Sequence, residues 1–126
     1  AVFGTRFDKN SKVKNYPFFK LMLNRIANNV IKILFLSNYN DFTNAFKIYK
    51  KKVLLKLFPI VSENFNIFLE LPLKIITRKL NYKIIPINWY GRKIGESKFK
   101  IKEIGSKYVY ILLYCFLEKI LLNKKK

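Results

Sequence analysis

The spacing of apolar and polar positions along the chain predicts a mixture of strands and helices. The opening run of residues 1–6, AVFGTR, has the pattern of a buried strand that carries Thr5 and Arg6 to its carboxyl end. Residues 46–58 alternate and then become continuously apolar, which predicts a short strand followed by a short helix. Residues 82–90 are strand-like, and Pro86 places that strand at a sheet edge or ends it early.

The clearest helix is predicted over residues 17–35, where apolar side chains recur at helical spacing and Pro17 suits a first turn. The polar stripe of this helix consists mostly of amides and cations. It has two interpretations, a surface for an anionic ligand or an ordinary solvated face. Its residues are Lys20, Asn24, Arg25, Asn28, Asn29 and Lys32.

A second helix is predicted over residues 62–80, with Ser62 as its N-cap. Pro72 should kink it, because proline lacks the amide that would bond to the carbonyl of residue 68. In this helix Glu70 has Lys74 one turn further on, and the two side chains can pair.

The last helix is predicted over residues 101–123. Its uninterrupted apolar stretch is far shorter than the ~20 residues that a bilayer span needs, so we do not expect it to cross a membrane. Aromatic residues within the stretch and lysines after it suit a helix that lies in the membrane interface. Packing against the core is the alternative.

The charge balance changes the picture of partners. The chain has 26 basic and 7 acidic side chains, a net charge of +19, together with 51% hydrophobic residues, so it should fold and should attract anions. The competing explanation is a biased genome, because Lys, Asn, Ile, Phe and Tyr are what A/T-rich DNA encodes.

Histidine is absent and the single cysteine, Cys115, lies in an apolar run. This excludes the usual Cys/His zinc sites, Cys-His nucleophile pairs and a disulfide framework, and it fits a reducing compartment. No two acids lie close enough in sequence for a local Mg²⁺ or Mn²⁺ clamp. The opening residues resemble a strand inside a fold rather than a start, so we expect a fragment of a longer protein.

The stretch NWYGRKIGESKFKIKEIG, residues 88–105, holds three of the four glycines and five basic residues. Gly91 and Gly95 permit backbone conformations that other residues avoid, and the side chains around them are hydrogen-bond donors. Such a loop can wrap a phosphate group, although it is not a Walker A loop. A solvated loop is the alternative.

The same stretch resembles the carboxy-terminal signature of glycosyltransferase family 2 enzymes of the dolichyl-phosphate mannose synthase and polyprenyl-phosphate sugar transferase type. Those enzymes have a strand ending in V-P-I and then an R-x-x-G-x-S-K pattern. Arg92, Gly95, Ser97 and Lys98 match this pattern.

Further stretches resemble the family in the same order along the chain. GTRF resembles G-S-R-[FY], NRIANN resembles an S-R-x-x-N helix, and DFTNAFKIYKK resembles D-x-T-S-G-F-[RK]-x-[YF]-[RK]-[RK]. A phenylalanine-rich segment with a central glutamate precedes the strand at residues 82–90. The matching residues are Arg25, Asn28, Asp41, Thr43, Phe46, Lys47 and Glu70. Thr5, Asn44, Ala45 and Asn81 depart mildly from the pattern, and Pro72 departs more clearly.

The resemblance implies an α/β fold, the carboxy-terminal half of a GT-A type (nucleotide-diphospho-sugar transferase) domain. Residues 1–100 would form the acceptor-side half of the catalytic domain. Residues 101–126 would form an amphipathic helix and basic tail at the membrane surface. The donor half, with its paired acids of D-x-D type, is absent, so this fragment alone should be inactive.

The implied reaction moves a sugar from a nucleotide-sugar to a lipid-linked phosphate of the polyprenyl or dolichyl type. By the resemblance, Arg6, Arg25 and Asn28 would bind the acceptor phosphate, and Arg92, Ser97 and Lys98 would bind the donor diphosphate. Asp41 and Arg92 would be catalytic, with a turn-forming role as the alternative for Asp41.

The resemblance also implies a divalent metal, Mg²⁺ or Mn²⁺, in the full-length enzyme, with ligands outside this chain. The expected partners are the nucleotide-sugar, the lipid phosphate and an anionic membrane surface on the cytoplasmic side, and no nucleic acid. Two other functions remain open. A basic nucleic-acid-binding module would suit the charge, and a membrane-surface scaffold without catalysis would suit the last helix.

Overall fold

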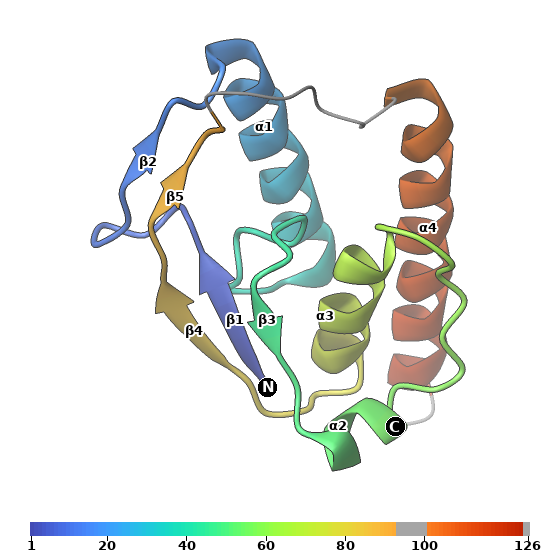
Figure 1. Ribbon diagram of the computed structural model, residues 1–126. Coiled ribbons are helices and arrows are strands. Elements are labelled where there is room, and N and C mark those ends of the chain that lie inside the picture. Colours follow the sequence, from blue (N-terminus) through green and yellow to red (C-terminus); the bar gives the residue numbers. More distant parts are fainter. Residues whose placement is uncertain (93–100, 125–126) are drawn as a thin grey trace.

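The computed structural model describes residues 1–92 and 101–124. Strands and helices are mixed along the described chain, as the sequence predicts (Figure 1). The elements in order are β1 (Val2–Thr5), β2 (Val13–Lys14), α1 (Phe18–Phe35), β3 (Lys47–Ile48), α2 (Lys51–Leu55), α3 (Ile67–Thr77), β4 (Lys83–Pro86), β5 (Trp89–Tyr90) and α4 (Ile101–Lys124).

The larger sheet has the strand order β3-β1-β4, with β1 parallel to β4 and antiparallel to β3. β4 ends at Pro86 and lies at an edge of this sheet, which confirms the prediction made from that proline. The predicted strand over residues 1–6 is confirmed as β1. The predicted loop after it contains an element that was missed, because β2 pairs in parallel with β5 as a second, two-stranded sheet.

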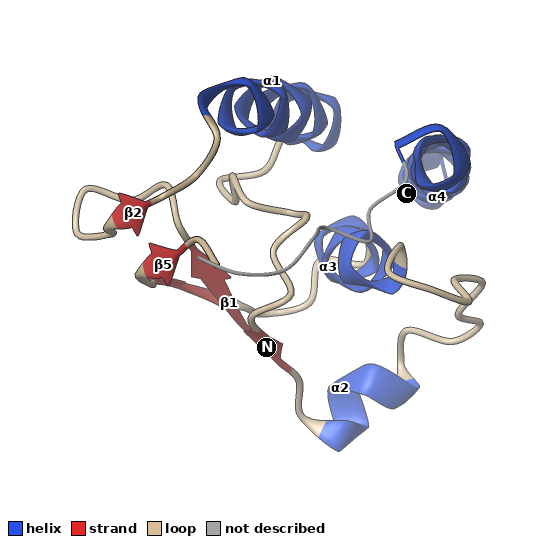
Figure 2. Cartoon of the chain, turned by 45° about the horizontal axis from the view of Figure 1, so that its top comes forward, coloured by secondary structure: helices blue, strands red, loops and turns tan. Residues whose placement is uncertain are grey.

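One face of the larger sheet packs into the core. Phe3 is fully buried there, and its ring lies 4.9 Å from that of Tyr82 and 5.0 Å from that of Tyr39. Side chains alternate along a strand, so Val2 and Gly4 point to the opposite face. On that face Ile48, which pairs with Val2, is 62% exposed. Figure 2 shows the helices together on one side of the sheet, so among the described residues the outer face has no covering element.

α3 is the central helix, and it is buried on nearly all sides. It runs through Pro72, so the carbonyl of Phe68 loses its usual partner in the helix. Lys47 replaces that partner, since its Nζ donates to the Phe68 carbonyl at 3.2 Å. The predicted start of this helix is wrong: α3 begins at Ile67, and the Ser62 amide instead donates to Glu70.

A buried ion pair holds the segment before α3 onto the helix. Lys74 Nζ lies 2.7 Å from Glu70 Oε1, both side chains are fully buried, and Lys74 also donates to the Pro59 carbonyl. Glu70 accepts the amides of Val61 and Ser62 at 3.0 and 2.8 Å. The expected pairing of Glu70 with Lys74 is therefore confirmed, in the core rather than on the surface.

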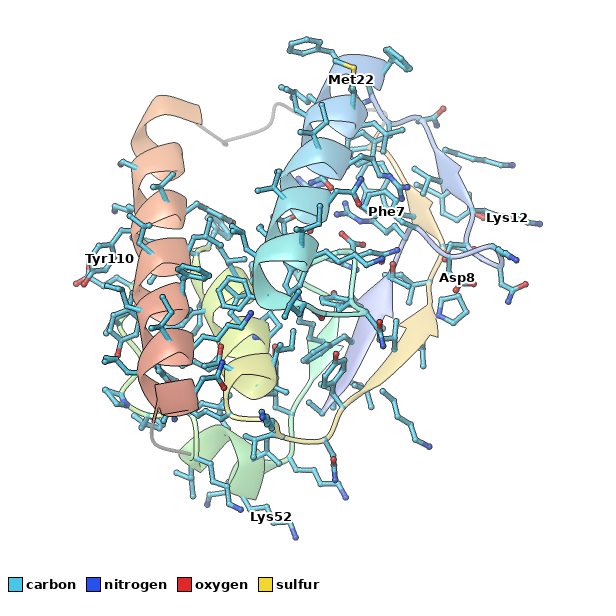
Figure 3. All side chains as sticks on the ribbon, turned by 180° about the vertical axis from the view of Figure 1, so that it is seen from behind. Phe7, Asp8, Lys12, Met22, Lys52 and Tyr110 are labelled. Carbon is cyan, nitrogen blue, oxygen red and sulfur yellow. The ribbon has the colours of Figure 1, made fainter. Side chains whose placement is uncertain are left out.

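α1 confirms the predicted helix over residues 17–35, but its buried side is not the apolar one. Asn28, Ile31 and Phe35 are buried, whereas the apolar stripe faces outward. Figure 3 shows Met22 projecting from the helix, away from the sheet. The exposed apolar residues of α1 are Phe18, Phe19, Met22, Leu23, Ile26, Val30, Ile33 and Leu34.

α4 packs one face against α3 and leaves the other exposed. Ile111 and Cys115 are fully buried, and Arg78 pairs with Glu118 at 2.6 Å between the two helices. Packing against the core, the alternative given for this helix, is thus confirmed for one side of α4. The exposed apolar residues of the other side are Val109, Tyr110, Leu113, Leu117, Ile120, Leu121 and Leu122. No helix in the described part of the chain is long and apolar enough to cross a membrane.

Replacing Lys74 with methionine should destabilise the fold by about 3–5 kcal/mol, because it leaves the Glu70 carboxylate buried without its cation. Burial raises the pKa of Glu70, but hydrogen bonds from Lys74, Ser62 and Val61 outweigh burial and hold the pKa below its ordinary value. The contribution of the carboxylate to stability is therefore present at neutral pH and is lost on acidification through the lowered pKa. As the pH falls, K74M should therefore lose less of its free energy of unfolding than the wild type, which urea unfolding across an acidic pH series measures. The exposed Lys52, changed to methionine, is the control, and equal stability of K74M and K52M would contradict the expectation.

Candidate functional site

The carboxyl end of β1 delivers Arg6 into a buried ion pair with Asp41. Arg6 Nε donates to Asp41 Oδ2 at 2.9 Å, Arg6 Nη2 donates to Oδ1 at 2.6 Å, and the Arg6 amide also donates to Oδ2. Burial lowers the pKa of Arg6, but the hydrogen bonds and charge of Asp41 raise it above its ordinary value. The guanidinium is therefore charged at every physiological pH.

Arg25 joins Arg6 at the ring of Phe7. The guanidinium carbon of Arg25 lies 4.5 Å from the ring centroid and that of Arg6 lies 5.3 Å from it. The two carbons are thus no more than about 10 Å apart. The aromatic face attracts both cations and keeps them near each other. Two of the predicted phosphate-binding residues, from β1 and α1, are brought together here.

Asn28, the third residue predicted for the acceptor phosphate, supports the turn that carries Asp41. It is buried, its Oδ1 accepts the Phe42 amide at 2.6 Å, and its Nδ2 donates to Asn24. Asn24 in turn donates to Thr43 Oγ1 at 3.0 Å. This side of α1 is therefore not an ordinary solvated face at these positions. A contact of Asn28 with phosphate remains a prediction, since the structure commits its amide to the protein.

Lys47 is a residue of the site for which sequence reasoning proposed no role. Its Nζ donates to the carbonyls of Phe42, Asn44 and Phe68, and it lies 5.7 Å from the ring centroid of Tyr39. Burial lowers the pKa of Lys47 to about 7, while Asp41 raises it and Arg6 lowers it further. An ammonium has three donors, so Lys47 joins the turn to α3 with all of them. The only indication of this role in the sequence is that Lys47 occupies the [RK] position after Phe46 in the motif that the chain resembles.

Arg92 is exposed and follows β5, which pairs with β2. Gly91 makes this pairing possible, since a Cβ at that position would lie 2.0 Å from the Asn15 carbonyl oxygen. Tyr16, just after β2, connects the two regions: its ring lies 4.6 Å from that of Trp89 and 5.8 Å from the guanidinium carbon of Arg6. The ends of β1 and β5 lie on the same side of the molecule as the start of α1 (Figure 1).

Ser97 and Lys98, the other residues predicted for the donor diphosphate, lie outside the described residues. The described residues contain no group of three or more His, Cys, Asp or Glu side chains that could hold a metal ion. Asp41 is already bonded to Arg6 through both oxygens. That the divalent metal implied by the family resemblance has its ligands outside this chain stays a prediction.

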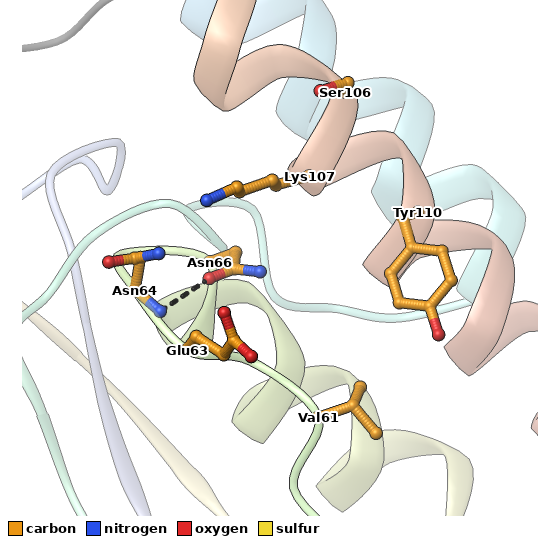
Figure 4. A pocket seen from close by; sticks show the side chains of 7 residues that line it. All are labelled: Val61, Glu63, Asn64, Asn66, Ser106, Lys107 and Tyr110. Carbon is orange, nitrogen blue, oxygen red and sulfur yellow. Dashed lines mark hydrogen bonds between the residues drawn. The ribbon is translucent and has the colours of Figure 1, made fainter.

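A cavity of about 460 Å³ lies elsewhere, between α4 and the loop before α3. Figure 4 shows Lys107 and Tyr110 from α4 opposite Glu63, Asn64 and Asn66, with the Asn64 amide bonded to Asn66 Oδ1 at 3.1 Å. The cavity contains one lysine and one glutamate and neither of the arginines at Phe7. It is thus separate from the residues predicted to bind phosphate.

The chain is similar to the polyprenol monophosphomannose synthase of Mycolicibacterium smegmatis. The two are 27% identical over 114 residues, which covers 81% of this chain and 43% of that protein. The chain therefore spans less than half the length of this relative. No protein-family profile and no solved structure matches the chain. The similarity supports, at a coarse level, the relationship to glycosyltransferases that the sequence motifs predict.

The partly buried amino group of Lys47 should make stability depend on pH in the neutral to alkaline range. Lys47 is held with a pKa of about 7, against 10.5 for an ordinary lysine, so the unfolded chain binds more protons between these values and stability rises with pH. The wild type should gain roughly 1 kcal/mol per pH unit between about pH 7.5 and 9.5, and K47M should not. Urea unfolding at several pH values measures this, with the exposed Lys50 changed to methionine as the control. A wild type whose slope equals that of K47M would show that Lys47 titrates normally.

Proposed function

We propose that this chain is the acceptor-side part of a GT-A type glycosyltransferase domain. In this proposal the domain moves a sugar from a nucleotide-sugar to a lipid-linked phosphate of the polyprenyl or dolichyl type. The observation that carries the proposal is the meeting of Arg6 and Arg25 at Phe7. These two arginines come from separate motifs of the resemblance, and the named relative is a polyprenol monophosphomannose synthase.

The chemistry asks for positioned cations rather than for a strong base. A phosphate monoester is already an anionic nucleophile, so the site has to hold it beside the sugar and stabilise charge on the departing diphosphate. Arg6 and Arg25 would hold the acceptor phosphate, since a guanidinium binds phosphate oxygens in a planar fork. Arg92 would act on the donor side together with Ser97 and Lys98.

The bare face of the larger sheet supports the assignment to a part of a domain. Sheets with parallel strands are usually covered on both faces, and here the face that carries Phe46 and Ile48 is open. β3, at one edge, also has unpaired backbone groups toward the outside. A donor-binding part that covers this face and extends this edge would complete an α/β domain.

The outward apolar stripes of α1 and α4 support action at a membrane surface. Both helices lie on the side of the molecule away from the sheet (Figure 3). Lysines border the stripe of α1, and the net charge of +19 favours anionic headgroups. Such a surface would place Arg6 and Arg25 close to the phosphate of a lipid in the membrane. We propose the cytoplasmic face, in keeping with the absence of a disulfide framework.

The assignment of Arg25 is tested by vesicle flotation. The wild type should prefer vesicles containing polyprenyl phosphate over vesicles of equal surface charge made with phosphatidylglycerol. R25A should lose about tenfold or more of its affinity for the former, because a charge-assisted phosphate contact is lost. Arg25 is exposed, so circular dichroism and thermal unfolding should be unchanged.

The matched control is K32A, which removes one exposed charge from the same helix. K32A should weaken binding to both kinds of vesicle slightly and equally. A wild type without any preference for the lipid phosphate would reject the proposed function. Tighter, salt-sensitive binding to an oligonucleotide than to either vesicle would favour a nucleic-acid-binding module instead.

The membrane-facing role of α1 predicts a second, separate result. Ile33 is 71% exposed on the apolar stripe, and I33E should reduce affinity for all anionic vesicles by about tenfold, because it removes the proposed apolar contact with lipid and adds a charge that the anionic headgroups repel. I48E makes the same change at a similarly exposed residue on the outer sheet face, and it should leave vesicle binding unchanged. Equal losses in both variants would show that α1 has no special part in membrane binding.

A further inference from the structure

Asp41 uses its whole carboxylate on one edge of Arg6. Oδ2 accepts from the Arg6 amide and from Nε, both at 2.9 Å, and Oδ1 accepts from Nη2 at 2.6 Å. Asp41 is fully buried and sits in a turn supported by Asn28 and Lys47. The carboxylate is therefore fixed before any ligand arrives.

Asp41 does not use the opposite edge of the Arg6 guanidinium, although the side chain as a whole is only 8% exposed. Of its five N–H groups, those on Nε and one on Nη2 face Asp41. Nη1 takes no part in the bonds to Asp41, and the Tyr16 ring lies beside the guanidinium, with its centroid 5.8 Å from the guanidinium carbon. A guanidinium presents a fork on each of two edges, and the edge formed by Nη1 and Nη2 matches two phosphate oxygens. Arg25, at the same phenylalanine ring, adds a second cation whose guanidinium carbon lies no more than about 10 Å from that of Arg6.

We propose that Asp41 is a positioning residue, which locks the Nε edge of Arg6 so that the Nη1/Nη2 edge receives a phosphate monoester. This inference rests on the proposed function and replaces the catalytic role predicted for Asp41. Asp41 touches neither substrate nor solvent in this arrangement, because it is buried and both its oxygens are occupied. A phosphate acceptor needs no base, so this assignment leaves the reaction complete.

A positioning role and a purely electrostatic role predict opposite signs for D41N. If Asp41 only offsets the charge of Arg6, removing its charge makes the site more positive, and affinity for a phosphate dianion rises. If Asp41 orients Arg6, the asparagine amide turns a donor toward the donors of Arg6, the side chain leaves its place and affinity falls.

The experiment compares wild type, D41N and the control K32A on vesicles with polyprenyl phosphate and on phosphatidylglycerol vesicles of equal charge. We expect D41N to lose about tenfold of its affinity for the lipid phosphate and none for phosphatidylglycerol. Thermal unfolding shows whether D41N is folded at the assay temperature. Affinity of folded D41N equal to or above that of the wild type overturns the inference.

R6K keeps the test sharp if D41N does not fold. It retains the cation beside Asp41, but an ammonium has no planar fork and cannot hold the carboxylate and a phosphate in fixed directions together. We expect R6K to lose about tenfold of its affinity for the lipid phosphate while keeping its fold and its binding to phosphatidylglycerol. Wild-type affinity in R6K overturns the inference.

NMR on ¹⁵N-arginine-labelled protein adds a measurement that a merely structural role would not move. On titration with inorganic phosphate, the Arg6 Nε–H should remain slow to exchange, because Asp41 stays bonded, while the Nη resonances shift. Faster exchange at Nε, as phosphate displaces Asp41, overturns the inference. A wild type without preference for the lipid phosphate instead rejects the proposed function itself, so the two failures are distinguishable.

Discussion

The site depends on the burial of the Asp41 carboxylate against Arg6. An unpaired carboxylate at this depth would cost several kcal/mol, so the pair forces the end of β1 and the turn after α1 to meet. Tyr39 adds a bond from its hydroxyl to the Gly4 carbonyl at 2.9 Å, and Asn44 bonds the same carbonyl. Once these segments are joined, Phe7 lies against α1 and Arg25 lies over its ring. The buried Arg6–Asp41 ion pair thus positions both cations of the site, Arg6 directly and Arg25 through Phe7.

The same turn is tied to the central helix by a lysine that compensates for a proline. Pro72 removes the amide that would bond the Phe68 carbonyl, and Lys47 supplies a donor from β3 instead. A proline inside a helix is ordinarily destabilising because a carbonyl is left unpaired. Here that carbonyl fastens the sheet to α3. Pro72, which departs from the pattern of the family that the chain resembles, is therefore accommodated without disturbing the pair of Glu70 and Lys74, which lie on either side of it.

Periodicity predicted the elements of this fold well and their environments poorly. The strand at residues 1–6, the short strand and helix after Phe46 and the helix over residues 17–35 all follow from local pattern. The pairing of β2 with β5 does not, because it joins short segments far apart in sequence and depends on the absence of a side chain at Gly91. Ser62 was predicted as an N-cap from its residue type. Its backbone amide instead donates to the Glu70 carboxylate, and a charged acceptor forms a stronger hydrogen bond than a neutral one. The site shows the same difference. The family resemblance assigned Arg6 and Arg25 to one phosphate, and the structure places both at the Phe7 ring. The role of Lys47 could not be predicted, because it depends on backbone carbonyl groups that no sequence pattern displays.

α1 shows why an amphipathic pattern does not reveal which side of a helix is inside. The pattern separates apolar from polar positions but does not say which face is buried. The contacts that each face makes with the rest of the protein decide that. The amides of Asn24 and Asn28 satisfy Phe42 and Thr43 in the buried turn, a demand that aliphatic side chains could not meet. The apolar stripe is left outward, which is unfavourable in water but favourable against lipid. The side of α1 that carries Arg25 therefore serves the protein and its proposed phosphate ligand, while the opposite side is free for a membrane. In the proposed function, one helix would in this way fix the distance between the cations that bind phosphate and a lipid surface.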